Sequence, residues 1–328
     1  MVTGKPDPLW SARVRASEPR DAIAEIVRRA RATSIVILNE AHHSPRDRAF
    51  AWDVARALRP LGYSILAAET FKNDARAEDV GSTARLAQDG FVRLGTGTYT
   101  RDPVFADFVR RALVIGYRPV AYEQTQAQRS PTGGVEEREQ AQADNLRANT
   151  LGRDPSAKIL VLVGHSHVAE APILGPGNPE TSWMAARLKR ATGIDPLTID
   201  QTSLTDLNAS TRSAHAEAAR RLDGRPGVLF EGERPLVLGQ FASAVDLQVV
   251  HPARSYVGGR PSWLARMGRR PVDVPKRLLP KTGRRLVQAF AADAPPDAVP
   301  LDQLVVTADR PASKLMLPDL EVRYAVQP

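Results

Sequence analysis

Apolar and polar residues along the first 200 positions follow two periods, one typical of helices and one typical of buried strands. In DAIAEIVRRARA (21–32) the apolar residues share one helical face. SIVILN, which follows, is the kind of apolar run that forms a strand buried on both faces. Further strands are predicted at SILAAE, RPVAYE, KILVLV and PLTID, and helices at FAWDVARALRPLG, DPVFADFVRRALVIG, EEREQAQADNLRANT and TSWMAARLKRATG. This β-α-β-α order predicts an α/β fold, a mostly parallel sheet with helices on both faces.

The pattern changes after about Leu222 to short strands separated by proline and glycine. VDLQVVHP is expected to close the sheet, and the last 38 residues alternate in the manner of a small β-rich unit. We therefore divide the chain into an N-terminal extension (1–19), an α/β domain (20–253), a basic linker (254–290) and a small β-rich C-terminal unit (291–328).

Composition narrows the classes of function. The chain has 328 residues and no cysteine, which excludes disulfides, thiolate metal sites and cysteine nucleophiles. No apolar run approaches the roughly 20 residues of a transmembrane helix. The first residues, MVTGKPDPLW, lack the apolar region of a signal peptide. We expect a soluble protein, cytoplasmic or, if a signal has been trimmed, periplasmic or secreted.

Positive charge is concentrated in the predicted linker. Residues 254–290 contain ten Lys or Arg and one acidic residue, a net of +9, whereas the whole chain carries +8. The rest of the chain therefore sums to −1, which argues against a nucleic-acid-binding protein. Two interpretations of the linker stay open: a solvated connection, or a contact with an anionic surface such as a membrane.

Ionisable residues follow four predicted strands at the end where parallel α/β sheets bind ligands. Strand ends are often polar merely because they are exposed. Here, however, four of the six histidines gather at this edge together with three carboxylates. The set comprises Glu40, His42, His43, Glu69, Glu123, His165 and His167. Imidazole beside carboxylate suits general base catalysis, and the same mixture can hold a divalent metal, so both uses stay open.

The run VGHSHV also raises a serine-hydrolase hypothesis, because Gly-x-Ser-x-Gly after a strand is the nucleophile elbow of that class. In this chain Val168 replaces the second glycine. The following AEAPILGPG contains prolines and cannot form the long helix that supports such a serine. Ser166 as nucleophile is therefore the less favoured alternative.

NEAHHSPRDR resembles the first motif, Gly-Glu-x-His, of the superfamily that joins erythromycin esterases, ChaN-like haem-binding lipoproteins and TIKI/TraB-type metalloproteases. Glu40 and His42 fit that motif, and Pro45 stands where ChaN-like members have Asn-Pro. Glu69, in AAETF, matches the family's second strand-terminal glutamate. The resemblance spans about residues 20 to 250 and rests on the order and placement of short motifs.

Two later motifs extend the resemblance. REQAQADN is similar to the esterases' Arg-Asp-x-x-Met-Ala-x-Asn and gives Arg138 and Asn145, whereas VGHSHV matches the final His-x-His motif. The chain departs from the family pattern at three positions, where Asn39 replaces glycine, Glu139 aspartate and Gln142 methionine.

The resemblance implies a hydrolase acting on an ester, lactone or amide. His42 would be the general base, oriented by Glu40 or Glu69, and His165 an electrophilic or second acid/base group. The residues expected to contact substrate are His43, Glu123, Arg138, Asn145 and His167. A divalent metal, if present, would be held by Glu40, His42, Glu69 and His165. The alternative that the family also implies is a haem- or metal-binding protein, in which haem would need an axial His or Tyr and an apolar wall.

Overall fold

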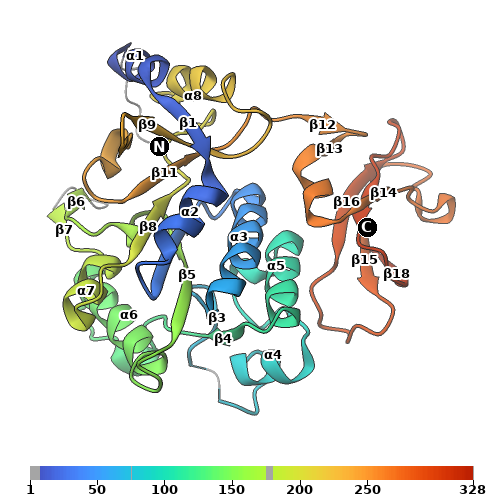
Figure 1. Cartoon of the computed structure of the whole chain (residues 1–328). Coiled ribbons are helices and arrows are strands. Elements are labelled where there is room, and N and C mark those ends of the chain that lie inside the picture. The colour runs from blue at the N-terminus through green and yellow to red at the C-terminus, as the bar shows by residue number, and fades with distance from the viewer. Residues whose placement is uncertain (1–7, 75, 175–179, 328) are drawn as a thin grey trace.

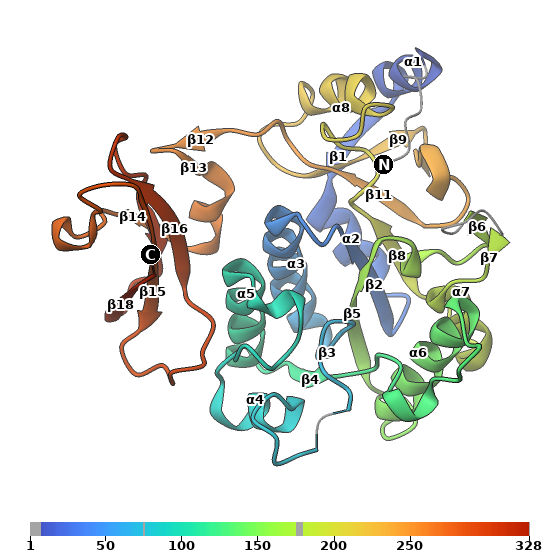
Figure 2. The same cartoon turned by 180° about the vertical axis from the view of Figure 1, so that it is seen from behind.

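The computed structural model describes residues 8–74, 76–174 and 180–327, and Figures 1 and 2 show an α/β body beside a small β-rich unit. The first seven residues of the predicted N-terminal extension lie outside the described residues. The helices of the described chain are α1 (Pro8–Ala16), α2 (Ala22–Ala30), α3 (Pro45–Leu58), α4 (Thr83–Asp89), α5 (Pro103–Val114), α6 (Val135–Asn149), α7 (Met184–Thr192) and α8 (Arg212–Ala219). Among them, none is both long and apolar enough to cross a membrane.

Two of the helices that cover the sheet begin at capping residues. Asp102 caps α5 by accepting hydrogen bonds from the N–H groups of Val104 and Phe105, and Pro103 occupies the first helical position. Asp21 caps α2 in the same way through the N–H of Ala24. These local signals set the residue at which each of these two helices begins.

The central sheet has nine strands in the described residues, in the order β1-β9-β11-β8-β2-β5-β3-β4, with β10 paired to β9. Neighbours from β11 to β4 are parallel, whereas β1, β9 and β10 pair antiparallel. The strands are β1 (Glu18–Asp21), β2 (Ile35–Glu40), β3 (Tyr63–Ala68), β4 (Arg118–Val120), β5 (Lys158–Gly164), β8 (Leu197–Asp200), β9 (Gly227–Glu231), β10 (Arg234–Pro235) and β11 (Leu247–Val250). A separate pair joins β6 (Ile173–Leu174) and β7 (Glu180–Thr181).

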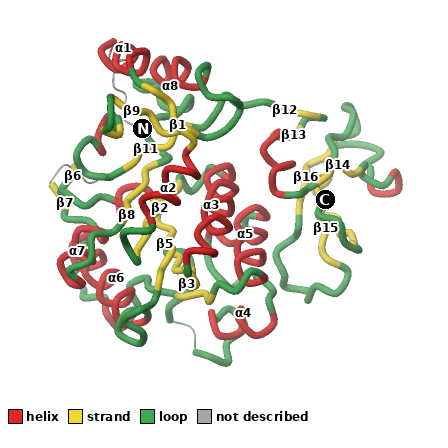
Figure 3. The backbone as a smooth tube through the Cα atoms, in the orientation of Figure 1, coloured by secondary structure: helices red, strands yellow, loops and turns green. Residues whose placement is uncertain are grey.

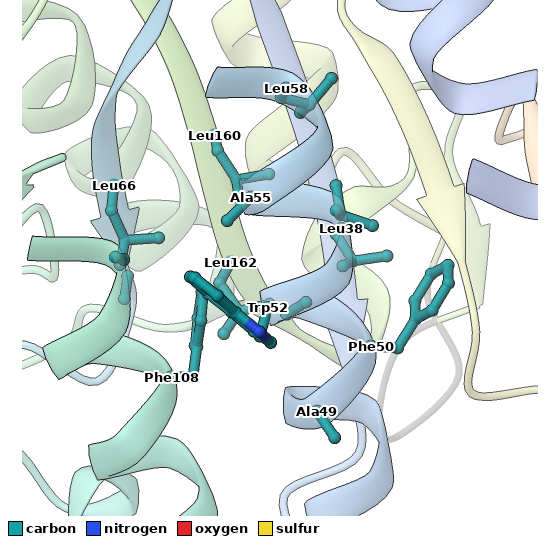
Figure 4. Close-up of a cluster of buried hydrophobic side chains, with 14 of the residues drawn as sticks. Leu38, Ala49, Phe50, Trp52, Ala55, Leu58, Leu66, Phe108, Leu160 and Leu162 are labelled. Atoms are coloured by element: carbon teal, nitrogen blue, oxygen red, sulfur yellow. The ribbon is translucent and has the colours of Figure 1, made fainter. Parts of the chain in front are cut away.

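Alternate residues of the parallel strands pack on opposite faces of the sheet. Val36 and Leu38 of β2 lie in one core cluster with residues of α2, α3 and α5, whereas Ile35 and Ile37 lie in a second cluster with residues of α6 and α7. Figure 4 shows Leu38 in the first cluster together with side chains from α3, β3, α5 and β5. The uninterrupted apolar runs in the sequence arise from this two-sided burial.

The C-terminal unit is antiparallel. It contains β14 (Arg270–Val272), β15 (Arg284–Ala291), β16 (Asp302–Thr307), β17 (Leu315–Leu317) and β18 (Val322–Gln327), preceded by the hairpin β12 (Tyr256–Val257) and β13 (Arg260–Pro261). It has its own apolar core, and Figure 3 shows its strands apart from those of the central sheet. The buried Arg269 joins it to α5 through an ion pair with Asp107 at 3.0 Å.

The predicted fold class is confirmed at the level of a mixed α/β protein with a mostly parallel central sheet and a C-terminal antiparallel β unit. The predicted position of VDLQVVHP is wrong: β11 lies between β8 and β9, because β1 and β9 extend the sheet beyond it. The strands of the C-terminal unit start before the expected boundary at 291, since β15 begins at Arg284. The expected linker also contains β12 to β14, and the expected N-terminal extension contains α1 and the first residues of β1.

Candidate functional site

Three neighbouring strands bring predicted site residues to one edge of the sheet. Glu40 is the last residue of β2 and lies opposite Gly164, the last residue of β5. Glu69 follows β3, and its N–H donates to the carbonyl of Leu162 on β5 at 3.1 Å. Because β5 lies between β2 and β3, the side chains that follow these strands meet around Gly164.

His42 and Glu40 form a hydrogen-bonded pair, with His42 Nδ1 2.8 Å from Glu40 Oε1. Glu40 Oε2 accepts from Arg48 Nε at 3.2 Å, and Arg48 also donates to the carbonyl of His42 at 2.8 Å. A neutral imidazole whose Nδ1–H donates to a carboxylate carries its lone pair on Nε2. No hydrogen bond or ion pair engages that Nε2 within the described part of the chain. His42 is therefore held with an open basic nitrogen.

Two rings fix the plane of His42. Tyr99 stacks on it with ring centroids 3.9 Å apart and an interplanar angle of 12°, and His165 approaches edge-on at 5.1 Å. His165 has a φ of 35°, in the left-handed region that residues other than glycine rarely occupy. Strained backbone of this kind is often found at functional sites. Here it directs the imidazole of His165 toward that of His42.

Gly164 leaves the space that the His42 ring occupies. A Cβ atom at this position would lie 2.5 Å from His42 Cε1, 2.7 Å from His42 Nε2 and 3.0 Å from Glu69 Oε2. The N–H of Gly164 donates to Glu69 Oε2 at 2.6 Å, which fixes that carboxylate beside the ring. Only glycine lets the strand approach His42 and Glu69 so closely.

A small cavity of about 10 Å³ opens beside this group and is lined by residues that include Glu40, His42, Glu69 and Tyr99. Its volume is on the scale of a single water molecule. A water held there would lie among the carboxylates and the imidazole of His42. The cavity thus offers a position for a water molecule that His42 can deprotonate.

A second group of charges lies on the other side of Glu69. Arg138 donates to Glu69 Oε1 at 2.5 Å and to both oxygens of Glu123 at 3.1 and 2.5 Å. His167 Nδ1 lies 2.8 Å from Glu139 Oε2, and its Nε2 lies 3.3 Å from Arg138 and 3.5 Å from Glu69 Oε1. We call these five residues the Arg138 network. Both nitrogens of His167 are thus engaged.

The surroundings shift the pKa values of His165 and His167, the two histidines that follow β5, in opposite directions. Desolvation, followed by repulsion from His42, lowers the pKa of His165. Desolvation would also lower the pKa of His167, but Glu69 and Glu139 outweigh it and raise that pKa. Burial raises the pKa of Glu69, yet His167 and Arg138 overcome this and lower it. The surroundings therefore favour the neutral form of His165 and the charged form of His167.

Asn39, which precedes Glu40 on β2, is fully buried and hydrogen-bonded through both its amide nitrogen and its amide oxygen. Its Nδ2 donates to the carbonyl of His165 at 3.0 Å and to Asp200 Oδ1 at 2.9 Å. Its Oδ1 accepts from the N–H of Gln201 at 2.8 Å. Asn39 thus ties the strained backbone of His165 to β2 and β8.

The remaining predicted residues lie in different places. Asn145 donates to the backbone carbonyls of Tyr122 and Glu123 and so positions the end of β4. His43 is exposed and lines a different, larger cavity. Ser166 lies in a four-residue 3-10 helix (His165–Val168), and none of the described histidines forms a hydrogen bond with its hydroxyl. This geometry gives the nucleophile hypothesis no support.

The predicted metal ligands do not fit a resident metal ion. Glu40 is bound to His42 and Arg48, and Glu69 is bound to Arg138 and to the N–H of Gly164. Among the described residues, no group of three or more His, Asp or Glu side chains is arranged to hold a metal. A haem is likewise far larger than the cavity of about 10 Å³ beside His42.

Sequence reasoning missed two residues that contact the Glu40–His42 pair. Arg48 lies six residues beyond His42, in a helical segment that reads as an ordinary amphipathic face. Tyr99 is the first residue of a short 3-10 helix (Tyr99–Arg101) before α5, where no motif marks it. The role of Gly164 could have been predicted, because a glycine between a buried strand and a turn, as in VGHSHV, indicates a close approach of the backbone.

Comparison with known proteins gives a distant structural likeness. No family model and no curated protein matches the chain. A solved structure of RRSP, a MARTX toxin effector domain from Vibrio vulnificus, shares 16% identity over 61% of this chain and 38% of that chain, with a TM-score of 0.39. A structure described as bacterial protein toxins shares 15% over 61% and 39%, with a TM-score of 0.40. The chain thus spans about two fifths of these structures' length.

Proposed function

We propose that the protein is a hydrolase of an ester, lactone or amide, with His42 as general base and Glu40 as the residue that orients it. The observation that carries this proposal is the 2.8 Å Glu40–His42 pair, which leaves Nε2 open beside a water-sized cavity. A relationship to the erythromycin-esterase and ChaN-like superfamily is part of the proposal. Its support is the placement of the quoted motif residues at one sheet edge.

The proposed reaction uses water as the nucleophile. His42 Nε2 takes a proton from the water while its oxygen attacks the substrate carbonyl carbon, and the carbonyl becomes a tetrahedral oxyanion. The carbon–oxygen or carbon–nitrogen bond to the leaving group then breaks, and the proton passes to the leaving group. His165, whose ring lies beside that of His42, can relay this proton from His42 to the leaving group. Glu40 stabilises the imidazolium that forms on His42.

The test is turnover of activated esters, lactones and anilides by the purified protein and by His42→Gln. We expect measurable turnover that the substitution removes. Equal rates in the two proteins, or no turnover of any substrate in the panel, would overturn the proposal. A parallel haemin titration addresses the carrier alternative, which a Soret band that His42→Gln abolishes would favour.

We also propose an anionic surface as a partner of the basic segment 254–290. Several of its arginines are neutralised inside the protein, as in the pairs Arg260–Asp302 and Arg269–Asp107. Five others are exposed and form no ion pair among the described residues: Arg266, Lys276, Arg277, Lys281 and Arg284. Co-sedimentation with anionic but not neutral vesicles, weakening as salt rises, is the expected result. Equal binding to both vesicle types would contradict it.

A further inference from the structure

A cavity of about 260 Å³ lies where the start of α3 meets the chain after β11. His43 and Arg46 line it from the α3 side, and Arg254, Tyr256 and Trp263 line it from the opposite side. The volume approaches the lower end of the range for small-molecule sites. It is much larger than the water-sized space beside His42.

Arg46 is a buried cation without a carboxylate partner. Only 8% of the residue is exposed, and its one hydrogen bond is a long contact of 3.5 Å from Nη1 to the carbonyl of Pro252. No ion pair reaches its guanidinium within the described residues. A buried charge is stable only when it is paired or hydrogen-bonded. The guanidinium therefore lines the cavity with most of its donors available to a ligand.

The other charges around the cavity leave it positive. Burial, with repulsion from Arg254 and Arg266, lowers the pKa of Arg46 against the opposing effect of Asp47 and Asp206. Arg254 is paired with Asp206 at 3.1 Å, so this carboxylate is already engaged by another arginine. Asp47 faces away, because its oxygens accept from the N–H of Ala41 and the hydroxyl of Ser44. Burial raises the pKa of Asp47 to about 7, which reduces its charge further.

The cavity also has an apolar wall. Trp263, Tyr256 and Leu207 line it, and Tyr256 and Leu207 remain 61% and 50% exposed. Exposed aromatic and aliphatic side chains beside a buried arginine fit an organic molecule that has an acidic group and an apolar body. The arginine fork matches the two oxygens of a carboxylate or phosphate.

We propose that this cavity binds the acidic group of the substrate, so that the hydrolase acts on anionic esters or amides. His43 connects the two sites, because it lines the cavity and follows His42 directly in the chain. A substrate anchored at Arg46 would extend past His43 to the imidazole of His42. This inference names the substrate class and rests on the proposed function, although anion binding itself does not.

Binding is measured first, because it needs no turnover. Phenyl phosphate is titrated against the protein while tryptophan fluorescence is followed, with benzyl alcohol as the neutral counterpart. We expect saturable quenching by phenyl phosphate alone, lost in Trp263→Phe. Charge-assisted hydrogen bonds predict affinities about tenfold or more weaker in Arg46→Met and Arg254→Gln. Arg56→Gln, an exposed substitution near the far end of α3, is the matched control and should bind normally.

The Arg254 variant keeps the test valid if Arg46→Met does not fold, because Arg254 lies at the exposed rim. Quenching that is equal for the neutral and anionic probes, or equal in all variants, would overturn the inference. Inorganic phosphate as a competitor tests the acidic group by itself. Competition supports the anion site, and failure to compete at any concentration contradicts it.

Turnover separates this inference from the proposed function. Mono-4-nitrophenyl succinate is compared with 4-nitrophenyl butyrate, a neutral ester of similar length. We expect a higher kcat/KM for the succinate, and a loss of this preference in Arg254→Gln. Arginine-dependent binding without turnover of either ester would overturn the proposed function and leave the anion site standing. Turnover with neither a preference for the succinate nor binding of the anionic probe would overturn this inference and leave the proposed function standing.

Discussion

The structure contains two histidine–glutamate pairs of equal length that differ in what surrounds them. His42 and Glu40 are 2.8 Å apart, and so are His167 and Glu139. The side chain of His42 is 28% exposed and that of His167 only 10%. His42 keeps an open Nε2, whereas the Nε2 of His167 faces Arg138 and Glu69. A histidine paired with glutamate through Nδ1 can act as a base only when its Nε2 can reach water.

The two pairs also use their neighbours differently. Around His42, Arg48 donates to the second oxygen of Glu40. The face of the His42 ring stacks on Tyr99, and its Nε2 forms no hydrogen bond with a described residue. Around His167, two carboxylates and an arginine surround the ring and raise its pKa. The first arrangement leaves one ring nitrogen free, and the second favours the charged form of the ring. We therefore propose a catalytic role for the first pair and a structural role for the second.

The largest effect that separates the pairs should be on activity. His42→Gln removes the proposed base and is expected to lower kcat/KM by roughly 10²- to 10⁴-fold, the usual contribution of general acid–base catalysis. Steady-state kinetics on the best ester substrate measures it. If His167→Gln lost as much activity while remaining as stable as the wild type, the assignment of roles would be reversed.

The next effect concerns stability. His167→Ala leaves Glu139, whose side chain is 0% exposed, without its histidine. Breaking a buried pair by removing one partner typically lowers the free energy of unfolding by about 3–5 kcal/mol. Denaturant unfolding measures the loss. His42→Ala is the matched control and should lose much less, because Glu40 keeps its ion pair with Arg48. Similar losses in both variants would contradict the contrast.

Gly164→Ala tests the contact between β5 and the His42 ring. The new methyl group would lie 2.5 Å from His42 Cε1, so the ring must move. A misplacement of about 1 Å in a catalytic group can lower the rate about 100-fold. Kinetics and circular dichroism together distinguish displacement from unfolding. Gly134→Ala, where an added Cβ meets nothing within 4 Å, is the control. A fully active Gly164→Ala would show that the ring position does not matter.

The pH dependence of stability should have opposite signs for the two histidines that follow β5. A raised pKa means that His167 stabilises the fold while protonated, fully below its unfolded pKa of about 6.5, and that this contribution is lost as pH rises through the folded pKa. His165, whose pKa is lowered, instead destabilises the fold as pH falls below about 6.5. Unfolding of His167→Gln and His165→Gln at about pH 5.5 and pH 9 tests this. Compared with wild type, His167→Gln should be destabilised more at the acid pH than at the alkaline pH. His165→Gln should instead become more favourable relative to wild type at the acid pH.

The smallest effect is expected for Ser166→Ala, which should change kcat/KM by no more than a few-fold. Its hydroxyl makes no hydrogen bond to a described histidine, and loss of a true nucleophile would remove almost all activity. Kinetics on the same ester provides the comparison with His42→Gln. An inactive, folded Ser166→Ala beside an active His42→Gln would replace the water mechanism with a serine mechanism.

The sequence predicted the strand ends better than it predicted how they combine. Burial on both faces makes β2, β3 and β5 visible as apolar runs, so Glu40, Glu69 and His165 could be placed at one edge. The insertion of β5 between β2 and β3 has no local signal, because strand order depends on long-range pairing.

The contrast between His165 and His167 could not be predicted from the motif. The two residues are separated by one position and match the same His-x-His pattern. The positive φ of His165 and the 3-10 turn that follows send one ring to His42 and the other to Glu139. The contact between Tyr99 and His42 could not be predicted either, because it depends on how the chain before α5 folds back toward β2.

Chemical rescue tests the central claim most directly. Imidazole added to inactive His42→Ala can occupy the space of the lost ring, beside Glu40 and the water-sized cavity. We predict that activity returns in a saturable manner and follows the titration of the added base. His167→Ala should show no such response, because this substitution is expected to lower the stability of the fold and not to remove the general base. Failure of imidazole and related bases to restore any activity to a folded His42→Ala, or equal rescue of His167→Ala, would contradict the role of His42 as general base.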